Sequence, residues 1–587
     1  MSKSIDQSHH ADYQQRTFAY QPCTEQEQAA DKKTRHPVII VGAGPSGLSA
    51  AIDIAQRGIP VVVVDDDNRL SNGSRAICFA KRTLDIFDRL GCAEPMVEKG
   101  VRWNVGRVFL QDQQVYQFDL LPETGHRRPA FINLQQYYVE GMLLERAQQL
   151  PNLEIRWKNR VTGLTRHGTD QGVTLTIETP DGAYDLHGRY IVAADGSRSA
   201  VRKLMCLDSK GRTFKDRFLI ADVKMKADFP AERWFWFDPP FHRNQSVLLH
   251  SQPDNVWRID FQLGWDADPE LEKQPERVIP RVRALLGKEA EFTLEWVSVY
   301  TFSCLRMDSF RHGAVLFIGD AAHGVSPFGA RGANSGVQDA ENLAWKLALV
   351  LQGNAPDSLL DSYASEREYA ADENILNSTR STDFITPKSD VSHLFRDAVL
   401  KLAQHHPFAR QLVNSGRLSV PAVLKTSHLN SPDVDATWSG NMVPGAVCAD
   451  VPIKIAGKDS WLLSAIGQKF TGLFFCDDAQ HLVQQISNLR LNTASIQALK
   501  LIVIVNRENL AAVGQAAHAL LTQSDQLIII EDYEGLAKQR YAARPGSFYL
   551  VRPDQHVCGR WRELNVAAIK TALQKALGLA DKQHVMH

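Results

Sequence analysis

The 587-residue sequence predicts a mixed α/β fold divided among several domains. Three observations support this prediction. A strand, a glycine-rich turn, a helix and a second strand follow one another over residues 38–65. Residues 212–304 are strand-like and rich in aromatic side chains, and short apolar runs alternate with helical stretches over residues 472–577. Because the chain is longer than one hydrophobic core supports, more than one domain is expected.

The first unit is the stretch VIIVGAGPSGLSAAIDIAQRGIPVVVVD. A β-branched run enters a Gly-x-Gly-x-x-Gly turn made by Gly42, Gly44 and Gly47, a helical pattern follows, and a second β-branched run ends on Asp65. This is the order of a dinucleotide-binding unit, in which the glycines permit a tight turn, close approach of a pyrophosphate and helix–strand packing. The helix N-terminus attracts phosphate, and Asp65 can accept hydrogen bonds from a ribose.

The periodicity then predicts further elements of the same kind. A helix is expected over residues 131–147, strands over 153–157 and 173–178, and a hairpin that feeds a buried strand over 181–202. The aromatic segment 212–304 is expected to form a sheet that covers a pocket.

A second chemical motif is the stretch HGAVLFIGDAAHGVSPFGARGANSGVQDAENLAWKLALVL. A buried strand ends at Asp320, and a Pro/Gly loop then opens a long helix with Leu343, Leu347 and Val350 on its apolar side. An acid at the end of a strand can hold a ribitol or ribose hydroxyl. The loop N–H groups and the helix N-terminus suit a group that gains negative charge.

Composition narrows the classes of partner. The chain carries 66 Lys and Arg against 67 Asp and Glu, so no global charge favours nucleic acid or an anionic membrane. No apolar run approaches the roughly 20 residues that span a membrane, and the N-terminal residues lack the apolar part of a signal peptide. The eight cysteines are dispersed, without metal-ligand spacing, which predicts reduced thiols in a cytoplasm and no metal site.

Three motifs therefore occur in a fixed order: GAGPSG with Asp65, AADGSRSAVR with Asp195 and Arg202, and GDAAHGVSPFGARGANSG with Asp320. In this combination the sequence resembles the class A flavoprotein monooxygenases, the aromatic-ring hydroxylases related to para-hydroxybenzoate, 3-(3-hydroxyphenyl)propionate and phenol hydroxylases. The resemblance covers roughly residues 37–385. It implies a Rossmann-type FAD-binding domain into which the substrate sheet is inserted.

The resemblance assigns cofactor roles to these motifs. In such proteins the first holds the adenosine diphosphate part of FAD, the last holds the ribityl chain and flavin ring, and the middle one supports both FAD and the transient cofactor NAD(P)H. Arg75 and Gln136 match a family arginine and glutamine that lie against FAD, with Gln135 as an alternative to Gln136. The implied FAD-binding residues are Gly42, Ala43, Gly44, Ser46, Gly47, Asp65, Arg75, Gln136, Asp195, Asp320, Pro327, Gly332 and Asn334.

The predicted division of the chain has four parts. Residues 1–35 form a polar arm, disordered or loosely docked, and residues 36–385 form the FAD-binding monooxygenase domain. Residues 386–440 are a helical segment and linker. Residues 441–587 resemble the thioredoxin-like C-terminal domain of the phenol hydroxylase branch without its Cys-x-x-Cys, so Cys476 cannot run dithiol exchange and a structural or oligomer-stabilising role is expected. The family resemblance makes a homodimer an expectation.

The resemblance also implies the reaction. NAD(P)H reduces FAD, the reduced flavin takes up molecular oxygen as a hydroperoxide, and its distal oxygen attacks the phenolic ring of an aromatic catabolite. Pro327 is expected beside both flavin and substrate. An ionisable group that favours the substrate phenolate raises the nucleophilicity of the ring. The candidates for the substrate side are Arg217, Asp222 and Tyr300, followed by Trp236, His242 and Arg258.

One departure from the family pattern bears on the substrate. Many relatives have Gly-Gly or Gly-Gln in the flavin loop where this sequence has Ala330-Arg331. Arg331 lies either beside the isoalloxazine or outward toward a carboxylate, and the choice affects the charge of the substrate.

Other functions share parts of the pattern. A Baeyer–Villiger or polyketide-tailoring flavin monooxygenase uses the same framework. A flavin-binding scaffold without turnover would use the C-terminal part as an interaction module. A flavin-dependent halogenase is a weaker alternative, because the stretch WFWFDP has Asp238 where that family has isoleucine.

Overall fold

The computed structural model describes residues 16–27, 34–71, 73, 75–168, 171–227, 229–413, 419–433, 435, 438–480, 482–485, 499–521 and 527–579. The predicted disorder of residues 1–15 and 28–33 therefore lies outside the described residues. The chain forms two compact units. Unit 1 comprises Met1–Pro122, Pro129–Ala340 and Ala371–Val420, and unit 2 comprises Glu123–Arg128, Glu341–Ala370 and Pro421–His587.

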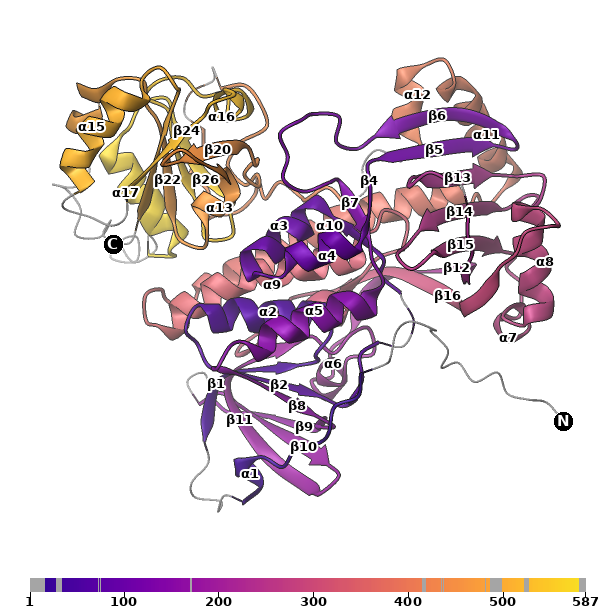
Figure 1. The fold of residues 1–587 in the computed structure, drawn as a ribbon. Coiled ribbons are helices and arrows are strands. Elements are labelled where there is room, and N and C mark those ends of the chain that lie inside the picture. The colour runs from indigo at the N-terminus through magenta and orange to yellow at the C-terminus, as the bar shows by residue number, and fades with distance from the viewer. Residues whose placement is uncertain are drawn as a thin grey trace. The chain divides into compact units, whose positions relative to one another are not determined.

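Unit 1 contains the predicted nucleotide-binding sheet, whose central strands are parallel (Figure 1). Helix α2 (Pro45–Gln56) begins at Pro45, whose fixed φ suits a first helical turn, and the chain turns back at Gly58, with φ of +81°. The strands, in spatial order, are β17 (Arg311–His312), β18 (Val315–Phe317), β11 (Gly182–Ala193), β1 (Arg35–Val41), β2 (Val61–Asp65) and β8 (Leu153–Trp157), with β10 (Val173–Thr179) paired to β11 and β9 (Arg160–Arg166) paired to β10.

A second sheet in unit 1 carries the predicted aromatic segment, and its two faces differ. Since side chains alternate along a strand, Trp234 and Trp236 pack on one face, and Phe235 and Phe237 pack on the other with Phe328. Helix α8 (Pro275–Leu286) covers the tryptophan face (Figure 1). The strands, in spatial order, are β19 (His323–Gly324), β16 (Thr293–Met307), β12 (Ser209–Lys224), β15 (Val256–Leu263), β14 (Ser246–Ser251), β13 (Arg233–Phe237), β5 (Val105–Leu110) and β6 (Gln113–Asp119).

The predicted helix over residues 131–147 is partly wrong. Phe131–Asn133 form the middle strand, β7, of a small three-stranded sheet, and the helix α5 (Gln136–Gln148) begins only at Gln136. Pairing with two distant strands overrides the local apolar pattern here. The partner strands are β3 (Cys78–Ala80) and β4 (Val101–Trp103).

Two of the other helices in the described part of the chain are long. Helices α9 (Gly332–Leu351) and α10 (Leu359–Ile385) each have residues in both units. The remaining helices among the described residues are α1 (Thr24–Glu27), α3 (Lys81–Leu90), α4 (Ala93–Lys99), α6 (Ala200–Leu204), α7 (Pro269–Glu272), the 3-10 turn η1 (Gly319–Ala321), α11 (Asp390–Ala403), α12 (Pro407–Leu412), α13 (Leu462–Ile466), α15 (Leu510–Leu521), α16 (Leu536–Arg540) and α17 (Val566–Ala576).

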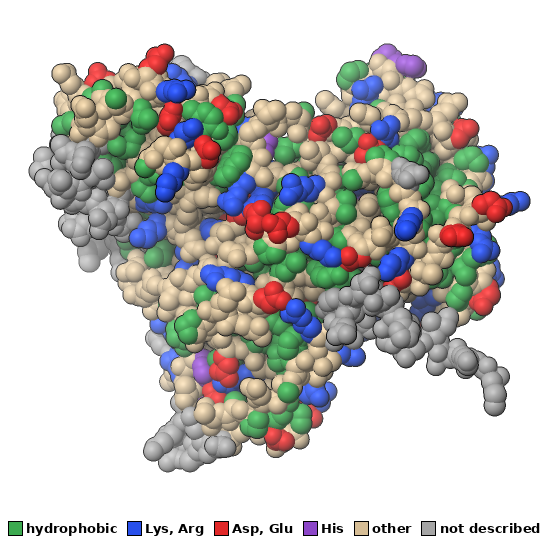
Figure 2. Space-filling view, in the orientation of Figure 1, with side chains coloured by type: hydrophobic (Ala, Val, Ile, Leu, Met, Phe, Trp, Pro, Cys, Tyr) green, Lys and Arg blue, Asp and Glu red, His purple; other side chains and the backbone are tan. Residues whose placement is uncertain are grey.

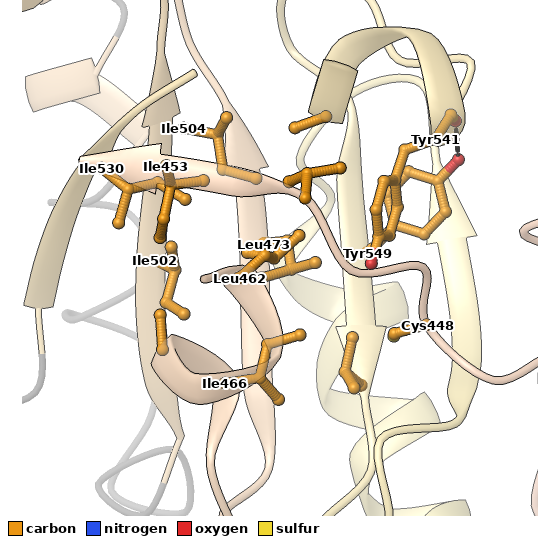
Figure 3. Packing of buried hydrophobic residues seen from close by; sticks show 14 of the residues in the cluster. Cys448, Ile453, Leu462, Ile466, Leu473, Ile502, Ile504, Ile530, Tyr541 and Tyr549 are labelled. Atoms are coloured by element: carbon orange, nitrogen blue, oxygen red, sulfur yellow. Dashed lines mark hydrogen bonds between the residues drawn. The ribbon is translucent and has the colours of Figure 1, made fainter. Parts of the chain in front are cut away.

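Unit 2 contains one seven-stranded sheet, and the short apolar runs predicted over residues 472–577 form five of its strands. The hairpin of β20 (Pro452–Ile455) and β21 (Lys458–Trp461) was not predicted. Apolar side chains fill the core, and the Tyr549 hydroxyl donates to the carbonyl of Tyr541 (Figure 3). The strands are β21 (Lys458–Trp461), β20 (Pro452–Ile455), β24 (Leu527–Glu531), β23 (Lys500–Val505), β22 (Thr471–Phe475), β25 (Phe548–Val551) and β26 (Val557–Trp561). The thioredoxin-like assignment stays a prediction.

A cluster of four charged side chains lies in the interior of unit 2. Glu366 accepts hydrogen bonds from Lys346 at 2.7 Å and from Arg552 at 2.5 Å and 3.1 Å, and Asp554 accepts from Arg552. All four side chains are fully buried. Desolvation raises the pKa of Glu366, but Arg552 and Lys346 outweigh it and bring the pKa below its ordinary value. Each charge is therefore balanced by its neighbours.

The surface carries charges of both signs. On the face in Figure 2, lysines and arginines are interspersed with aspartates and glutamates. This mixture agrees with the net charge of −1.

Candidate active site

In the glycine turn of unit 1, Gly42 and Gly47 are closely packed, whereas Gly44 faces open space. Gly42 has φ of +107°, and a Cβ added there would lie 2.5 Å from the carbonyl oxygen of Ala194. A Cβ added at Gly47 would lie 2.0 Å from the carbonyl oxygen of Gly42. At Gly44 the φ is −75° and an added Cβ would meet no atom within 4 Å. The backbone of Gly44 therefore borders a space that a ligand can approach closely.

That space is a pocket at the carboxyl end of β2. It is lined by Ala43, Gly44, Asp65, Asp67, Arg69, Leu70, Ser71, Glu140 and Trp157. Asp65 accepts hydrogen bonds from the N–H groups of Ala43 at 2.6 Å and Asp67 at 2.9 Å. Burial raises the pKa of Asp65 to about 6. These contacts fix the carboxyl group beside the glycine turn.

Gln136 anchors the loop that carries Arg75. Its amide donates to Ser71 at 3.0 Å and to Glu140 at 2.8 Å, and its carbonyl accepts from the N–H of Ala76 at 3.2 Å. Gln135 instead reaches the carbonyl of Pro253. Glu140, which was not predicted, lies four residues after Gln136 and so on the same helix face.

The third motif brings Asp320 near Arg75. Desolvation raises the pKa of Asp320, while the charges of His323 and Arg75 act to lower it. The buried carboxylate of Asp339 binds His323 at 2.7 Å and accepts from the N–H of Gly319 at 3.0 Å. Asp339 thus holds both sides of the turn that presents Asp320.

The three motifs meet through close packing. A Cβ at Gly319 or Gly336 would lie 2.8 Å or 2.2 Å from the Ser46 hydroxyl, so Ser46 packs between these glycines. Arg202 donates to the Ala321 carbonyl at 2.8 Å. Asp195 accepts from the N–H of Val201 at 3.0 Å, in the first turn of the helix that contains Arg202, and Ser199 caps this helix.

The loop after Asp320 is held in an unusual conformation. Gly329 has φ of +112° and Ala330 has φ of +53°, a left-handed conformation that suits glycine better than alanine. Asn334 fixes the loop, because its amide donates to the carbonyls of Ala330 and Cys78, and its oxygen accepts from Ala80 N–H at 2.8 Å. Gly332 begins α9 directly after this loop, and Pro327 precedes its bend.

The substrate-side candidates fall in different places. Asp222 and Arg258 form a buried bidentate pair, with both N···O distances 2.8 Å. Tyr300 lies beside Phe218 and Phe302 on the face toward Phe328, and burial raises its pKa well above its ordinary value. Arg217 lies elsewhere and donates to the carbonyls of Trp265 and Ala267. Trp236 packs on the α8 face, and His242 contacts the Gln262 carbonyl at 2.6 Å.

A second pocket lies between the loop and the aromatic sheet. It is lined by Arg107, Val108, Phe118, Arg233, Phe235, Phe237, Phe328, Gly329, Arg331, Ser381, Ile385 and Val413. Arg233 was not predicted. The only signal for it was its position two residues before Phe235, on the same side of a strand.

The N-terminal arm reaches the first pocket. Phe18 stacks on Trp157 with ring centroids 4.7 Å apart, and its backbone exchanges hydrogen bonds with Asn68 at 2.8 Å and 3.1 Å. Because Trp157 lines the pocket together with Asp65, Phe18 of the N-terminal arm packs behind the wall of this pocket.

Replacing Phe18 with alanine is expected to weaken binding of a nucleotide in this pocket by about tenfold at most, since a stacked aromatic pair contributes about 0.5–1.5 kcal/mol. The dissociation constant of FAD, measured by fluorescence on deflavinated protein, tests this. Tyr20→Phe, which removes an arm hydroxyl bonded to Thr179, is the matched control. Equal affinity in Phe18→Ala and the unchanged protein would show that the arm has no part in the pocket.

Two further features concern cofactors and membranes. The described residues contain no group of three or more His, Cys, Asp or Glu side chains placed to hold a metal ion. Within the same part of the chain, no helix has both the length and the apolar character that crossing a bilayer requires. All eight cysteines are free thiols.

Comparison with known proteins supplies independent information. A family model described as "FAD binding domain" matches residues 35–378. A probable NADH-specific resorcinol 4-hydroxylase from Rhodococcus jostii (strain RHA1) is 33% identical over 344 residues, which cover 56% of this chain and 62% of that protein. A 3-(3-hydroxy-phenyl)propionate/3-hydroxycinnamic acid hydroxylase from Mycolicibacterium smegmatis is 25% identical over 91% of this chain and 92% of its own length.

Solved structures agree on the fold. The flavin-dependent monooxygenase PieE, in complex with FAD and substrate, superposes with a TM-score of 0.74 at 20% identity, covering 93% of this chain and 99% of that chain. The p-nitrophenol 4-monooxygenase PnpA from Pseudomonas putida DLL-E4 gives a TM-score of 0.59 at 25% identity, covering 66% of this chain and 99% of that chain. The predicted mixed α/β fold with an FAD-binding part is confirmed.

Proposed function

Because this chain belongs to the FAD binding domain family, we propose that it is an NAD(P)H-dependent, FAD-containing monooxygenase that hydroxylates a phenolic ring. The observation that supports this best is the second pocket, whose wall combines Phe328 and Arg331 of the flavin loop with Phe235 and Phe237 of the aromatic sheet. An aromatic ring in this pocket lies against the loop that the family resemblance assigns to the flavin. Two relatives are named as hydroxylases of single-ring phenols.

The residues around the first pocket fit FAD. The open space at Gly44 leaves room for a pyrophosphate, and Asp65 is placed to accept from a ribose. We assign the ribityl chain to Asp320, and Arg75, which lies near Asp320, to the adjoining phosphate. Gln136 positions the Arg75 loop. The other predicted members have packing roles in this proposal, since Ser46, Asn334 and Asp195 hold the motifs together.

When bound, FAD supplies the redox chemistry, with NAD(P)H as reductant and molecular oxygen as oxidant. The protein positions the substrate ring and keeps water away from it. The aromatic walls of the second pocket exclude water from the reacting ring. The pKa of Tyr300 is about 10 in its ordinary state, and burial raises it further, so at neutral pH its hydroxyl can serve as a hydrogen-bond donor and not as a base.

On the substrate side, Asp222 acts through Arg258. The bidentate pair fixes the guanidinium, which reaches the Arg75 carbonyl at 3.4 Å and so connects the aromatic sheet with the loop at the cofactor. Pro327 stays a prediction as a residue beside both flavin and substrate. A catalytic role for Arg217 also stays a prediction, and its contacts with Trp265 and Ala267 carbonyls lend it no support.

The test is oxidation of NADH and NADPH by the FAD-loaded protein with a panel of phenols, following oxygen and hydrogen peroxide together. A coupled hydroxylase gives faster NAD(P)H oxidation with one oxygen consumed per product and little peroxide. Bound FAD that no phenol or polycycle makes reactive would instead support the scaffold alternative.

Three further properties belong to the same proposal. Molecular oxygen is the co-substrate, and a cytoplasmic location agrees with the free thiols. A homodimer follows from the family resemblance alone, and sedimentation of the FAD-loaded protein tests it.

Protonation of Asp65 is expected to weaken FAD binding. Burial raises the pKa of this carboxyl from 3.8 to about 6, and only the ionised form accepts hydrogen bonds with both oxygens. The dissociation constant of FAD should therefore rise by up to about tenfold between pH 7 and pH 5.

The same group acts on folding with the opposite sign. A carboxyl whose pKa is higher in the folded protein takes up protons on folding, so its contribution to stability is greatest at low pH and falls as the pH rises from about 4 to 6. In Asp65→Asn, the affinity for FAD should be weak and lose this pH dependence. An unaltered pH profile would assign the effect to another group.

A further inference from the structure

The second pocket has an apolar part and a cationic part. Phe235, Phe237 and Phe328 supply aromatic walls. Arg233, from strand β13, and Arg331, from the flavin loop, bring two guanidinium groups to the same cavity, and both residues are buried, with 8% and 4% of their surface exposed. Aromatic walls beside two buried arginines suit a ligand that is itself an aromatic ring with an acidic group.

Arg233 has an unused hydrogen-bond donor. Its Nη1 atom is buried and meets no acceptor among the residues that the structure describes. A buried donor without a partner is costly, and more so when it is charged. The guanidinium therefore needs an acceptor that the described protein atoms do not supply.

The neighbouring acids offset the arginine charges of this pocket only in part. Asp222 is engaged through both oxygens by Arg258. Asp260 interacts with the charges of Arg258 and Arg233, and although burial raises its pKa to about 6, it is mostly ionised at pH 7 and offsets part of their positive charge.

The remaining groups at the pocket do not add negative charge. Arg331 donates to the neutral amide of Asn374 at 3.2 Å. His250, beside Arg233 in the sheet, is held neutral because burial lowers its pKa well below the ordinary value. Arg107, at the rim, is paired with Glu232. The balance of these groups is positive.

We propose that the pocket binds a phenolic carboxylic acid, with its carboxylate held by Arg233 and Arg331 and its ring against Phe235, Phe237 and Phe328. This inference rests on the proposed function and narrows it from phenols in general to anionic phenols. The planar fork of a guanidinium donates two parallel hydrogen bonds to a carboxylate, which a neutral hydroxyl cannot accept in the same way. In this proposal Arg331 points outward to the substrate carboxylate and does not lie beside the isoalloxazine, which was the other arrangement that the sequence left open.

The experiment compares each acid with its primary amide, which has nearly the same shape but no charge. Hydroxybenzoic, hydroxyphenylacetic and hydroxyphenylpropionic acids and their amides are titrated into the FAD-loaded protein, and binding is followed by calorimetry and by the flavin absorption spectrum. At least one acid should bind about tenfold or more tighter than its amide. In Arg233→Met the dissociation constant of that acid should rise about 30-fold or more, while that of its amide changes little.

Two variants keep the result interpretable. Arg243→Met removes an exposed arginine that pairs with Asp238 on the same segment, and it should leave the acid-to-amide ratio unchanged. Arg233→Lys retains the charge without the fork, and its affinity for the acid should fall between those of Arg233→Met and the unchanged protein. FAD content and thermal unfolding show whether each variant is folded.

The outcomes separate the two proposals. If neutral phenols bind and are hydroxylated while acids have no advantage and Arg233→Met changes nothing, the substrate inference is overturned and the proposed function stands. If neither acids nor neutral phenols perturb the bound flavin or speed NAD(P)H oxidation, the proposed function itself fails.

Discussion

Replacing Glu366 with alanine is expected to lower the free energy of unfolding of unit 2 by about 3–5 kcal/mol. Glu366 is the acceptor shared by Lys346, Arg552 and Asn342, and its side chain is fully buried. Without it, two cations remain in the interior against the single carboxylate of Asp554. Chemical denaturation of the FAD-loaded protein, followed by circular dichroism, measures the change.

A paired replacement distinguishes charge balance from lost packing. Glu366→Met combined with Arg552→Met removes one charge of each sign and leaves Lys346 with Asp554, so it should cost less than Glu366→Ala alone. Asp361→Ala, at an exposed position in the first turn of the same helix, should cost less than about 1 kcal/mol. If the double variant is as unstable as the sum of its single variants, charge balance is not the cause.

Gly44→Val is expected to abolish retention of FAD while the protein still folds. The backbone at Gly44 has φ of −75° and ψ of 179°, which any residue adopts, and an added Cβ meets no atom within 4 Å. The side chain would instead occupy the space assigned to the pyrophosphate. The affinity for FAD should fall at least about 100-fold, equivalent to about 3 kcal/mol.

Gly42 supplies the contrasting control. Its φ of +107° and the 2.5 Å approach of a Cβ to the Ala194 carbonyl predict that Gly42→Val disturbs folding itself. Dissociation constants for FAD and melting curves of the deflavinated proteins compare the two variants. A Gly44→Val protein that binds FAD as tightly as the unchanged chain would place the pyrophosphate elsewhere.

The parts of the fold that the sequence predicts well depend on local patterns. The strand, glycine turn and helix around Gly42 are encoded within 28 consecutive residues, Val38–Asp65, and the structure confirms them. Phe131–Asn133 were misassigned to a helix because their strand conformation depends on pairing with Cys78–Ala80 and Val101–Trp103, which a local window does not contain.

In the candidate site, too, the residues that follow local patterns are predictable and those placed by distant strand pairing are not. Asp65 and Asp320 stand at the ends of recognisable strands, so their neighbourhood was predictable. The place of Arg233 depends on which face of β13 turns inward, and that is set by parallel pairing with β5, more than 100 residues earlier in the chain. The sequence predicts the aromatic segment 212–304 only as a whole, whereas in the structure its alternate residues pack on opposite faces of the sheet.

Unit 2 draws residues from three separated parts of the chain, including Glu341–Ala370. Lys346 and Glu366 lie in that middle part, whereas Arg552 and Asp554 come from the end. A gene fragment that starts at Pro421 would therefore encode Arg552 and Asp554 but not Lys346 and Glu366, so Arg552 would lose one of its two carboxylate partners. The C-terminal part is consequently not a transplantable module, and its exchange between relatives by recombination requires a crossover on each side of residues 341–370 as well as one near residue 421.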